Sequence, residues 1–142
     1  MSATRFQKIT LGIAGITALG IGTFILGAPH AFYTSYGIEL GSDINLLSEL
    51  RAPAANLAAL GAIMLAGIVR PAWWQVSAAV ALTVFLAFPV GRVIGIAVDG
   101  MPSATVLGAL AIEVFISAMC LVAFWHKPSS GSTREPLLDL PG

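Results

Sequence analysis

Four long apolar stretches constrain the fold of this 142-residue chain more than any other feature. They cover residues 9–28, 52–69, 73–98 and 104–125. Each is close to the roughly 20 residues that a helix needs to cross the hydrocarbon core of a bilayer. A spanning segment must satisfy its backbone hydrogen bonds internally, and apolar runs that are continuous instead of alternating indicate helices, not barrel strands. The sequence therefore predicts an all-α fold, a four-helix transmembrane bundle.

Composition limits the number of domains. Only 10% of the residues are charged, whereas about a quarter are charged in soluble domains. Four spans leave no room for a soluble module, so we expect one transmembrane domain over residues 1–126. Its helices are expected at about 9–28, 48–69, 73–98 and 104–125. Residues 127–142 are rich in Ser, Pro and Gly and are predicted to form a disordered cytoplasmic tail.

The basic residues predict how the chain is oriented in the membrane. If the N-terminus is cytoplasmic, five of the seven Lys and Arg residues lie in inner segments. These five are Arg5, Lys8, Arg70, Lys127 and Arg134. The remaining two, Arg51 and Arg92, belong to helices and not to loops. Because an excess of Lys and Arg marks the cytoplasmic side, both termini are expected in the cytoplasm.

Two charged residues, Arg92 and Glu113, lie inside stretches that are otherwise apolar. Ionisable groups at this depth cost roughly 2.5–3.5 kcal/mol each, so they are usually paired or functional. Arg92 precedes Asp99 by seven residues and Glu113 follows Ala104 by nine, which places them about 10 and 13 Å from the outer ends of their helices. Since the two helices are antiparallel neighbours, we predict an ion pair in the outer half of the bundle.

Other polar residues are expected near the same outer end. Glu49 and Arg51 begin the second span, and Asn56 lies one heptad below Glu49. Tyr36 belongs to the long connection over residues 29–47. The sequence thus predicts an outward-facing pocket between the second, third and fourth helices. Its candidate ligand-binding residues are Arg51, Arg92, Glu113, Glu49, Asn56 and Tyr36. The alternative is that Arg92 and Glu113 form a purely structural salt bridge.

Prolines and small residues predict local features of the helices. Pro89 cannot donate to the carbonyl of Phe85, so the helix is expected to kink or a neighbour or water to satisfy that acceptor. Pro53 lies near the first turn if Ser48 is the N-cap, and inside a longer helix if Asp43 is.

Small residues recur every four positions in two helices, a spacing that allows close backbone approach within membranes. The two stripes are Ala14, Ala18 and Gly22 in the first helix, and Ala54, Ala58, Ala62 and Ala66 in the second. The sequence does not say whether these stripes meet each other or a second copy of the chain.

Familiar catalytic and metal-binding patterns are absent from the sequence. Cys120 is the lone cysteine, and His30 and His126 would lie on opposite faces of the membrane, too far apart to share a metal. No nucleophile or phosphate-loop motif occurs, and the basic residues are too few and dispersed for nucleic acid. We therefore predict no catalytic residue, cofactor, metal or nucleic-acid partner, and we lean against an enzyme.

Several short segments resemble a family of small bacterial four-helix membrane proteins known only as a domain of unknown function. They include Glu49-Leu50-Arg51-Ala52, Arg92 followed by Asp99-Gly100-x-Pro102, and Glu113. The resemblance covers residues 12–123 and implies a multi-pass protein of the bacterial cytoplasmic (inner) membrane, with no activity to carry over. In architecture alone the chain is also similar to DoxX-type proteins, some of which are subunits of membrane oxidoreductases.

Two functions follow from these observations. In the first, the pocket binds or transports a small anionic or lipid-headgroup ligand, held by Arg51 or Arg92 and neutralised by Glu113. In the second, the bundle is an accessory or scaffold subunit of a membrane complex. The expected partners are the lipid bilayer, the small anionic ligand, and either further copies of the chain or another membrane protein.

Overall fold

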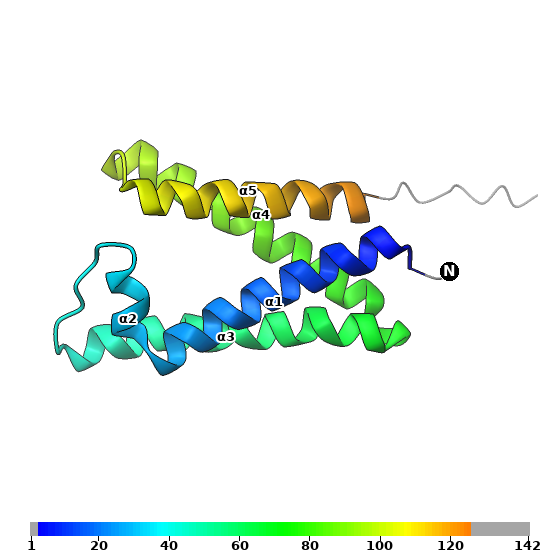
Figure 1. Cartoon of the computed structure of the whole chain (residues 1–142), viewed down its shortest axis with the longest axis horizontal. Coiled ribbons are helices and arrows are strands. Elements are labelled where there is room, and N and C mark those ends of the chain that lie inside the picture. Colours follow the sequence, from blue (N-terminus) through cyan, green and yellow to red (C-terminus); the bar gives the residue numbers. More distant parts are fainter. Residues whose placement is uncertain (1–2, 126–142) are drawn as a thin grey trace, which may run out of the picture.

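The computed structural model describes residues 3–125, and this part of the chain is helical without any strand. Four long helices make up the bundle in Figure 1: α1 (Arg5–Gly27), α3 (Ile44–Val69), α4 (Trp74–Asp99) and α5 (Ala104–Phe124). A short helix, α2 (Pro29–Thr34), follows α1, and a 3-10 turn, η1 (Pro71–Trp73), precedes α4. The predicted all-α class with four long helices is confirmed. The expected tail over residues 127–142 lies outside the described residues.

Four segments of the described chain are long and apolar enough to cross a membrane. They are Arg5–Gly27, Ile44–Val69, Pro71–Asp99 and Ala104–Phe124. Side chains such as those of Ile16, Val98 and Val122 are exposed on the outside of the bundle. Lipid accommodates such a surface, because it offers no penalty for exposed apolar side chains. The protein is thus a multi-pass membrane protein.

The start of α1 is fixed by a reciprocal cap. The Thr4 side chain accepts a hydrogen bond from the backbone N–H of Gln7 (3.2 Å), and the Gln7 side chain accepts one from the N–H of Thr4 (2.9 Å). The amide nitrogen of Gln7 also donates to the carbonyl oxygen of Ala123 at 2.8 Å. That carbonyl is in the last turn of α5, where helical partners are missing. Gln7 therefore joins the start of α1 to the end of α5.

Helix α3 begins at Ile44, four residues before the expected start at 48. The reason is Asp43, whose Oδ1 accepts from the backbone N–H groups of Asn45 (2.9 Å) and Leu46 (3.4 Å). Of the two caps considered, Asp43 is the one used, and Pro53 consequently lies inside the helix. Helix α2 was not predicted, although Pro29 at its first position is a common way to start a helix.

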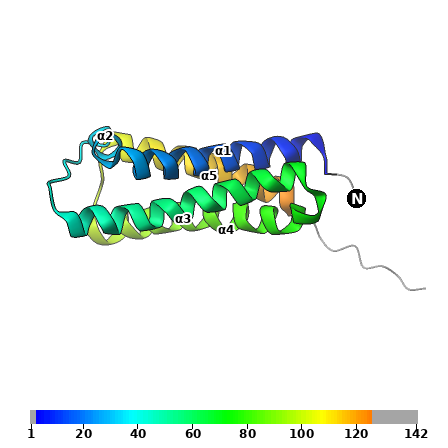
Figure 2. The same cartoon turned by 90° about the horizontal axis from the view of Figure 1, so that it is seen from below.

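The four long helices form two layers, with α1 and α5 in one and α3 and α4 in the other (Figure 2). We call the end that holds the start of α1, η1 and the end of α5 the N-terminal end, and the opposite one the α2 end. Helices α1 and α5 approach each other at the N-terminal end and diverge toward the α2 end, where α2 lies between them (Figure 1). The bundle is therefore closed at one end and splayed at the other.

The closed part is filled by a continuous apolar core. Its members are buried side chains from all four long helices: Leu11, Ala14, Ala18, Leu57, Met64, Ala81, Val84, Phe85, Ile116 and Cys120. At the N-terminal end the rings of Trp74 and Phe124 meet edge to face with centroids 5.9 Å apart. The Ser77 hydroxyl donates to the carbonyl of Ile63 at 2.6 Å, which joins α4 to α3. These contacts hold both layers together away from the α2 end.

Helices α1 and α3 pack with their backbones in contact. A Cβ atom on Gly22 would lie 2.5 Å from the backbone nitrogen of Ala58 and 2.6 Å from the carbonyl oxygen of Ala54. On the other helix, a Cβ on Gly61 would lie 2.9 Å from the carbonyl oxygen of Gly15. Only glycine fits at these positions, because the groups in the way are backbone atoms that cannot rotate aside.

The two stripes of small residues thus face each other and not a second copy of the chain. Ala14, Ala18 and Gly22 of α1 are all buried, as are Ala54 and Ala58 of α3. Farther along α3 the expected spacing fails, since Ala62 is exposed and Gly61 makes the contact. A spacing of four residues drifts around a helix of 3.6 residues per turn, and the contact line therefore shifts from Ala58 to Gly61.

The close contact of α1 and α3 predicts a strong effect of substituting Gly22. In Gly22→Val the added carbons collide with the backbone of α3, and we expect the free energy of unfolding to fall by about 1–3 kcal/mol or more. The matched control is Gly20→Val on the same helix, where an added Cβ meets nothing within 4 Å. Unfolding in mixed detergent micelles, followed by circular dichroism, measures both. Equal losses for the two variants would contradict the close packing.

Candidate functional site

Arg92 and Glu113 form the predicted ion pair between α4 and α5. The guanidinium donates from Nε to Glu113 Oε2 at 2.7 Å and from Nη2 to Oε1 at 2.8 Å. Such a two-fold contact fixes the planes of both groups and is stronger than a single hydrogen bond. The side chain of Arg92 is 28% exposed and that of Glu113 is 13% exposed. Glu113 therefore lies deeper and holds the more accessible guanidinium in one orientation.

Pro89 and Ser117 fix α4 against α5 beside this pair. Because Pro89 has no N–H, the carbonyl of Phe85 loses its partner within the helix. The hydroxyl of Ser117 on α5 donates to that carbonyl, and its oxygen lies 2.7 Å from the carbonyl oxygen of Glu113. Of the alternatives expected for this acceptor, the structure shows satisfaction by a neighbour. Arg92 and Glu113 lie within about one helical turn of Pro89 and Ser117, so this second link helps to align them.

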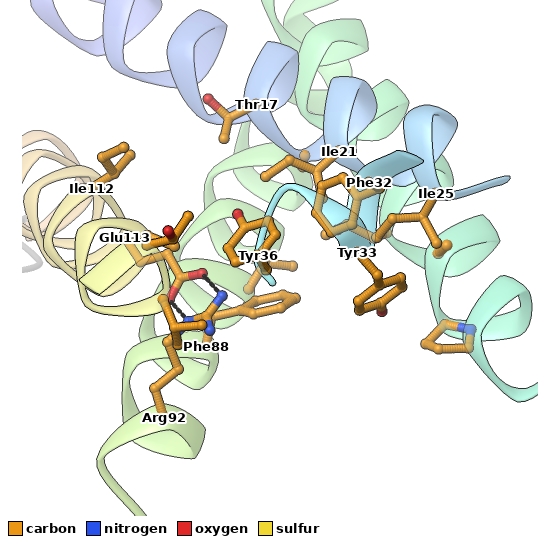
Figure 3. A pocket seen from close by; sticks show the side chains of 18 of the residues that line it. Thr17, Ile21, Ile25, Phe32, Tyr33, Tyr36, Phe88, Arg92, Ile112 and Glu113 are labelled. Atoms are coloured by element: carbon orange, nitrogen blue, oxygen red, sulfur yellow. Dashed lines mark hydrogen bonds and ion pairs between the residues drawn. The ribbon is translucent and has the colours of Figure 1, made fainter. Parts of the chain in front are cut away.

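A cavity of about 800 Å³ lies beside the ion pair in the splayed half of the bundle. All four long helices, α2 and the connection after α2 contribute to its walls. Apolar side chains dominate the lining, and they include Ile21, Ile25, Leu57, Val84, Phe88, Ile112 and Ile116. Arg92 and Glu113 are the two charged residues in it. Figure 3 shows both at one side of this space, with Thr17 and Ile21 of α1 across from them.

An aromatic cluster covers the cavity at the α2 end. The ring of Phe32 packs against Phe24, Tyr33 and Tyr36 with centroid distances of 5.5, 5.3 and 5.2 Å. These contacts hold α2 and the following turn on α1. Tyr36 lies between Phe32 and the ion pair in Figure 3. Burial raises the pKa of the Tyr33 hydroxyl and the neighbouring Tyr36 raises it further, so Tyr33 remains a neutral donor at physiological pH.

Three of the six predicted site residues meet at this cavity and three do not. Arg92, Glu113 and Tyr36 line it. Glu49, Arg51 and Asn56 are exposed and are not among the lining residues, so the expected position of Arg51 on the pocket wall is wrong. The cause is helical phase. On α3 the cavity is faced by Leu50, Pro53, Ala54 and Leu57, a set with helical spacing from which residues 49, 51 and 56 are excluded.

Sequence reasoning also missed the contribution of α1 and α2. Thr17, Ile21 and Ile25 of α1 form one wall, and Phe32 of α2 forms part of the cover. Apolar residues of a membrane helix look alike whether they face lipid, a core or a cavity, so the sequence of α1 held no signal. Phe88 was detectable, because it lies one turn before Arg92 and must share its face.

The residues that could bind metal are dispersed in the described part of the chain. No group of three or more His, Cys, Asp or Glu residues is placed to hold an ion between residues 3 and 125. Cys120 is buried in the apolar core, and His30 lies near the carbonyl oxygen of Gly41 at 3.4 Å. The polar side-chain groups at the cavity are a guanidinium, a carboxylate, two phenols and the hydroxyls of Thr17 and Thr105.

Comparison with known proteins identifies the family. The chain belongs to the family described as "Domain of unknown function (DUF4345)", whose profile matches residues 6–124. The match includes the four long helices except for the first residue of α1, and it contains every residue of the cavity. No curated protein matches the chain, and no solved structure does.

The ion pair predicts a marked asymmetry between single and double substitutions. Arg92→Leu leaves the deeper Glu113 without a partner, and removal of one member of a buried pair typically costs about 3–5 kcal/mol. The double change Arg92→Leu with Glu113→Leu leaves no uncompensated charge and should cost much less. Unfolding free energies in detergent for the wild type, both single variants and the double variant give the coupling. If Arg92→Leu and the double variant are equally destabilised, the two groups do not stabilise each other.

Proposed function

We propose that the protein binds a small amphiphilic molecule in the cavity at the α2 end, with the anionic head of this ligand at Arg92. The observation that carries the proposal is a cavity of about 800 Å³ whose lining is apolar apart from one ion pair and a few hydroxyl groups. Small-molecule sites typically combine apolar walls with a few oriented polar groups. A fatty acid or a lipid with an anionic headgroup has the matching division into polar and apolar parts.

The guanidinium of Arg92 supports an anionic head. The guanidinium has five N–H donors, and two of them donate to Glu113. The other three have no acceptor among residues 3–125. Unpaired donors are costly in apolar surroundings, so they require water or a ligand. A carboxylate or phosphate supplies several acceptors at once, and Glu113 keeps the guanidinium oriented while they bind.

The remaining walls support an apolar body. Ile21 and Ile25 of α1, Leu57 of α3, Val84 of α4 and Ile116 of α5 all line the cavity. An alkyl chain placed here removes apolar surface from water and fills space between side chains. The exposed lining residues Phe88 and Ile112 belong to membrane-spanning helices, so the cavity borders on the lipid. The bilayer is therefore the proposed source of the ligand.

This function predicts preferential binding of an anionic probe. We expect purified protein in detergent to bind a dansyl-labelled fatty acid more tightly than its methyl ester, measured by fluorescence titration. The double change Arg92→Met with Glu113→Met should weaken the acid by about 10- to 100-fold, because charged hydrogen bonds contribute about 1.5–3 kcal/mol. Arg70→Met, which removes an exposed charge at the N-terminal end, is the control and should bind as the wild type does.

A second variant tests the cavity itself. Gly108 lines the cavity and a Cβ there meets nothing within 4 Å, so Gly108→Phe occupies the space without a backbone clash. It should reduce binding of both probes, whereas Gly20→Phe on open surface should not. Unchanged binding in Gly108→Phe and in the double methionine variant would overturn the proposal. The accessory-subunit hypothesis, with Arg92 and Glu113 as a structural link, would then be the better one.

The proposed location is the bacterial cytoplasmic membrane, with both termini in the cytoplasm. Support comes from the basic residues near the N-terminal end, Arg5, Lys8 and Arg70, since Lys and Arg accumulate on the cytoplasmic side. Alkaline phosphatase fused after Gly142 should be inactive, and a fluorescent protein fused there should fluoresce. Phosphatase inserted at Gly41, in the exposed connection between α2 and α3, should be active. The reverse pattern would invert the orientation, and the cavity would then open toward the cytoplasm.

A further inference from the structure

We infer that a second, smaller cavity is a water inlet that leads from the aqueous surface at the α2 end to the guanidinium of Arg92. This cavity measures about 240 Å³ and lies at the turn between α4 and α5. Gly95 and Asp99 of α4, Pro102 of the turn and Val106 of α5 are among its lining residues. Its outer part is at the ends of two membrane-spanning helices, where the bilayer meets water.

Arg92 connects the two cavities. It lines the small one together with Asp99, and it lines the large one together with Glu113. Val106 also belongs to both linings. Arg92 therefore forms part of the wall between the turn and the large apolar cavity. Seven residues separate Arg92 from Asp99, which corresponds to about 10 Å along α4.

Polar groups along this route lack hydrogen-bond partners among residues 3–125, and the hydrocarbon of the bilayer provides none. Ser103 gives no side-chain cap to α5, and the first backbone N–H of that helix with a protein acceptor is Leu107, which donates to Ser103 at 3.1 Å. The N–H groups of Thr105 and Val106 are thus without acceptors in the described chain, as are three donors of Arg92. Backbone groups and charges at the edge of a bilayer are satisfied by water.

The size and shape of the small cavity fit this role. Water occupies about 30 Å³ per molecule in the liquid, and a cavity of 240 Å³ holds several. Gly95 keeps the space open, since a Cβ there would meet nothing within 4 Å and a larger side chain would fill the inlet. Water at Arg92 lowers the cost of a charge at membrane depth.

Cysteine labelling in membranes tests the inlet without reference to any ligand. In a Cys120→Ala background, Gly95→Cys places a thiol in the small cavity, and Ile94→Cys places one on the neighbouring lipid-facing surface, where the side chain is 57% exposed. A charged, membrane-impermeant methanethiosulfonate reagent reacts only with thiolate in contact with water. We expect Gly95→Cys to react at least about tenfold faster than Ile94→Cys, with Met101→Cys on the exposed turn as the fast reference.

A second pair keeps the test decisive if Gly95→Cys does not fold. Leu110→Cys lines the same cavity from α5, and Ala111→Cys is its exposed neighbour on the lipid side. The reagent is added to membrane vesicles of both orientations, so the outcome does not depend on the assumed topology. If both cavity thiols are labelled slowly while Met101→Cys is labelled fast, the inference of a water inlet is wrong. Failure of the fatty-acid probe to bind would leave this result unchanged, because no amphiphile takes part.

Discussion

Hydrocarbon offers no hydrogen-bond partners, and two backbone carbonyls of the bundle that lack a partner in their own helix are satisfied by side chains of a neighbouring helix. Pro89 frees the carbonyl of Phe85, and Ser117 of the next helix satisfies it. The last turn of α5 leaves the carbonyl of Ala123 unpaired, and the Gln7 side chain reaches it from α1. Both of these carbonyls thus become links between helices. Lipid does not drive helices together, so such links and close packing must hold the bundle.

Close packing is distributed unevenly along the bundle, and this produces the cavity. The glycines at the contact of α1 and α3 hold those two helices so near each other that they pack as one unit. Arg92 with Glu113 and Ser117 with Phe85 do the same for α4 and α5. The two units meet in the buried core toward the N-terminal end and separate toward α2, where Phe32 and its aromatic neighbours cover the gap.

The sequence predicted the fold class, the ion pair and the unpaired carbonyl of Phe85, because each rests on a local rule, but it did not identify Ser117 as the partner of that carbonyl. Hydrophobic length gives the spans, and rise per residue gives the common depth of Arg92 and Glu113. The residues that form the cavity walls were harder to predict from the sequence. Arg51 was placed by its depth in the membrane, but its side chain is exposed on a face of α3 that does not line the cavity. Depth alone does not give the rotation of a residue about the helix axis. Apolar side chains occur equally at lipid-facing, core and cavity positions, so the sequence did not indicate that Ile21 lines the cavity.

An ion pair that served only as a structural link would not require a cavity beside it. Here the pair lies between two cavities, and the member with unused donors, Arg92, is the more exposed one. Glu113 lies deeper and accounts for the guanidinium's fixed orientation. A group that is held rigidly by one partner, with donors left toward open space, is pre-organised for a third. This arrangement supports the proposed binding of an anionic acceptor at Arg92.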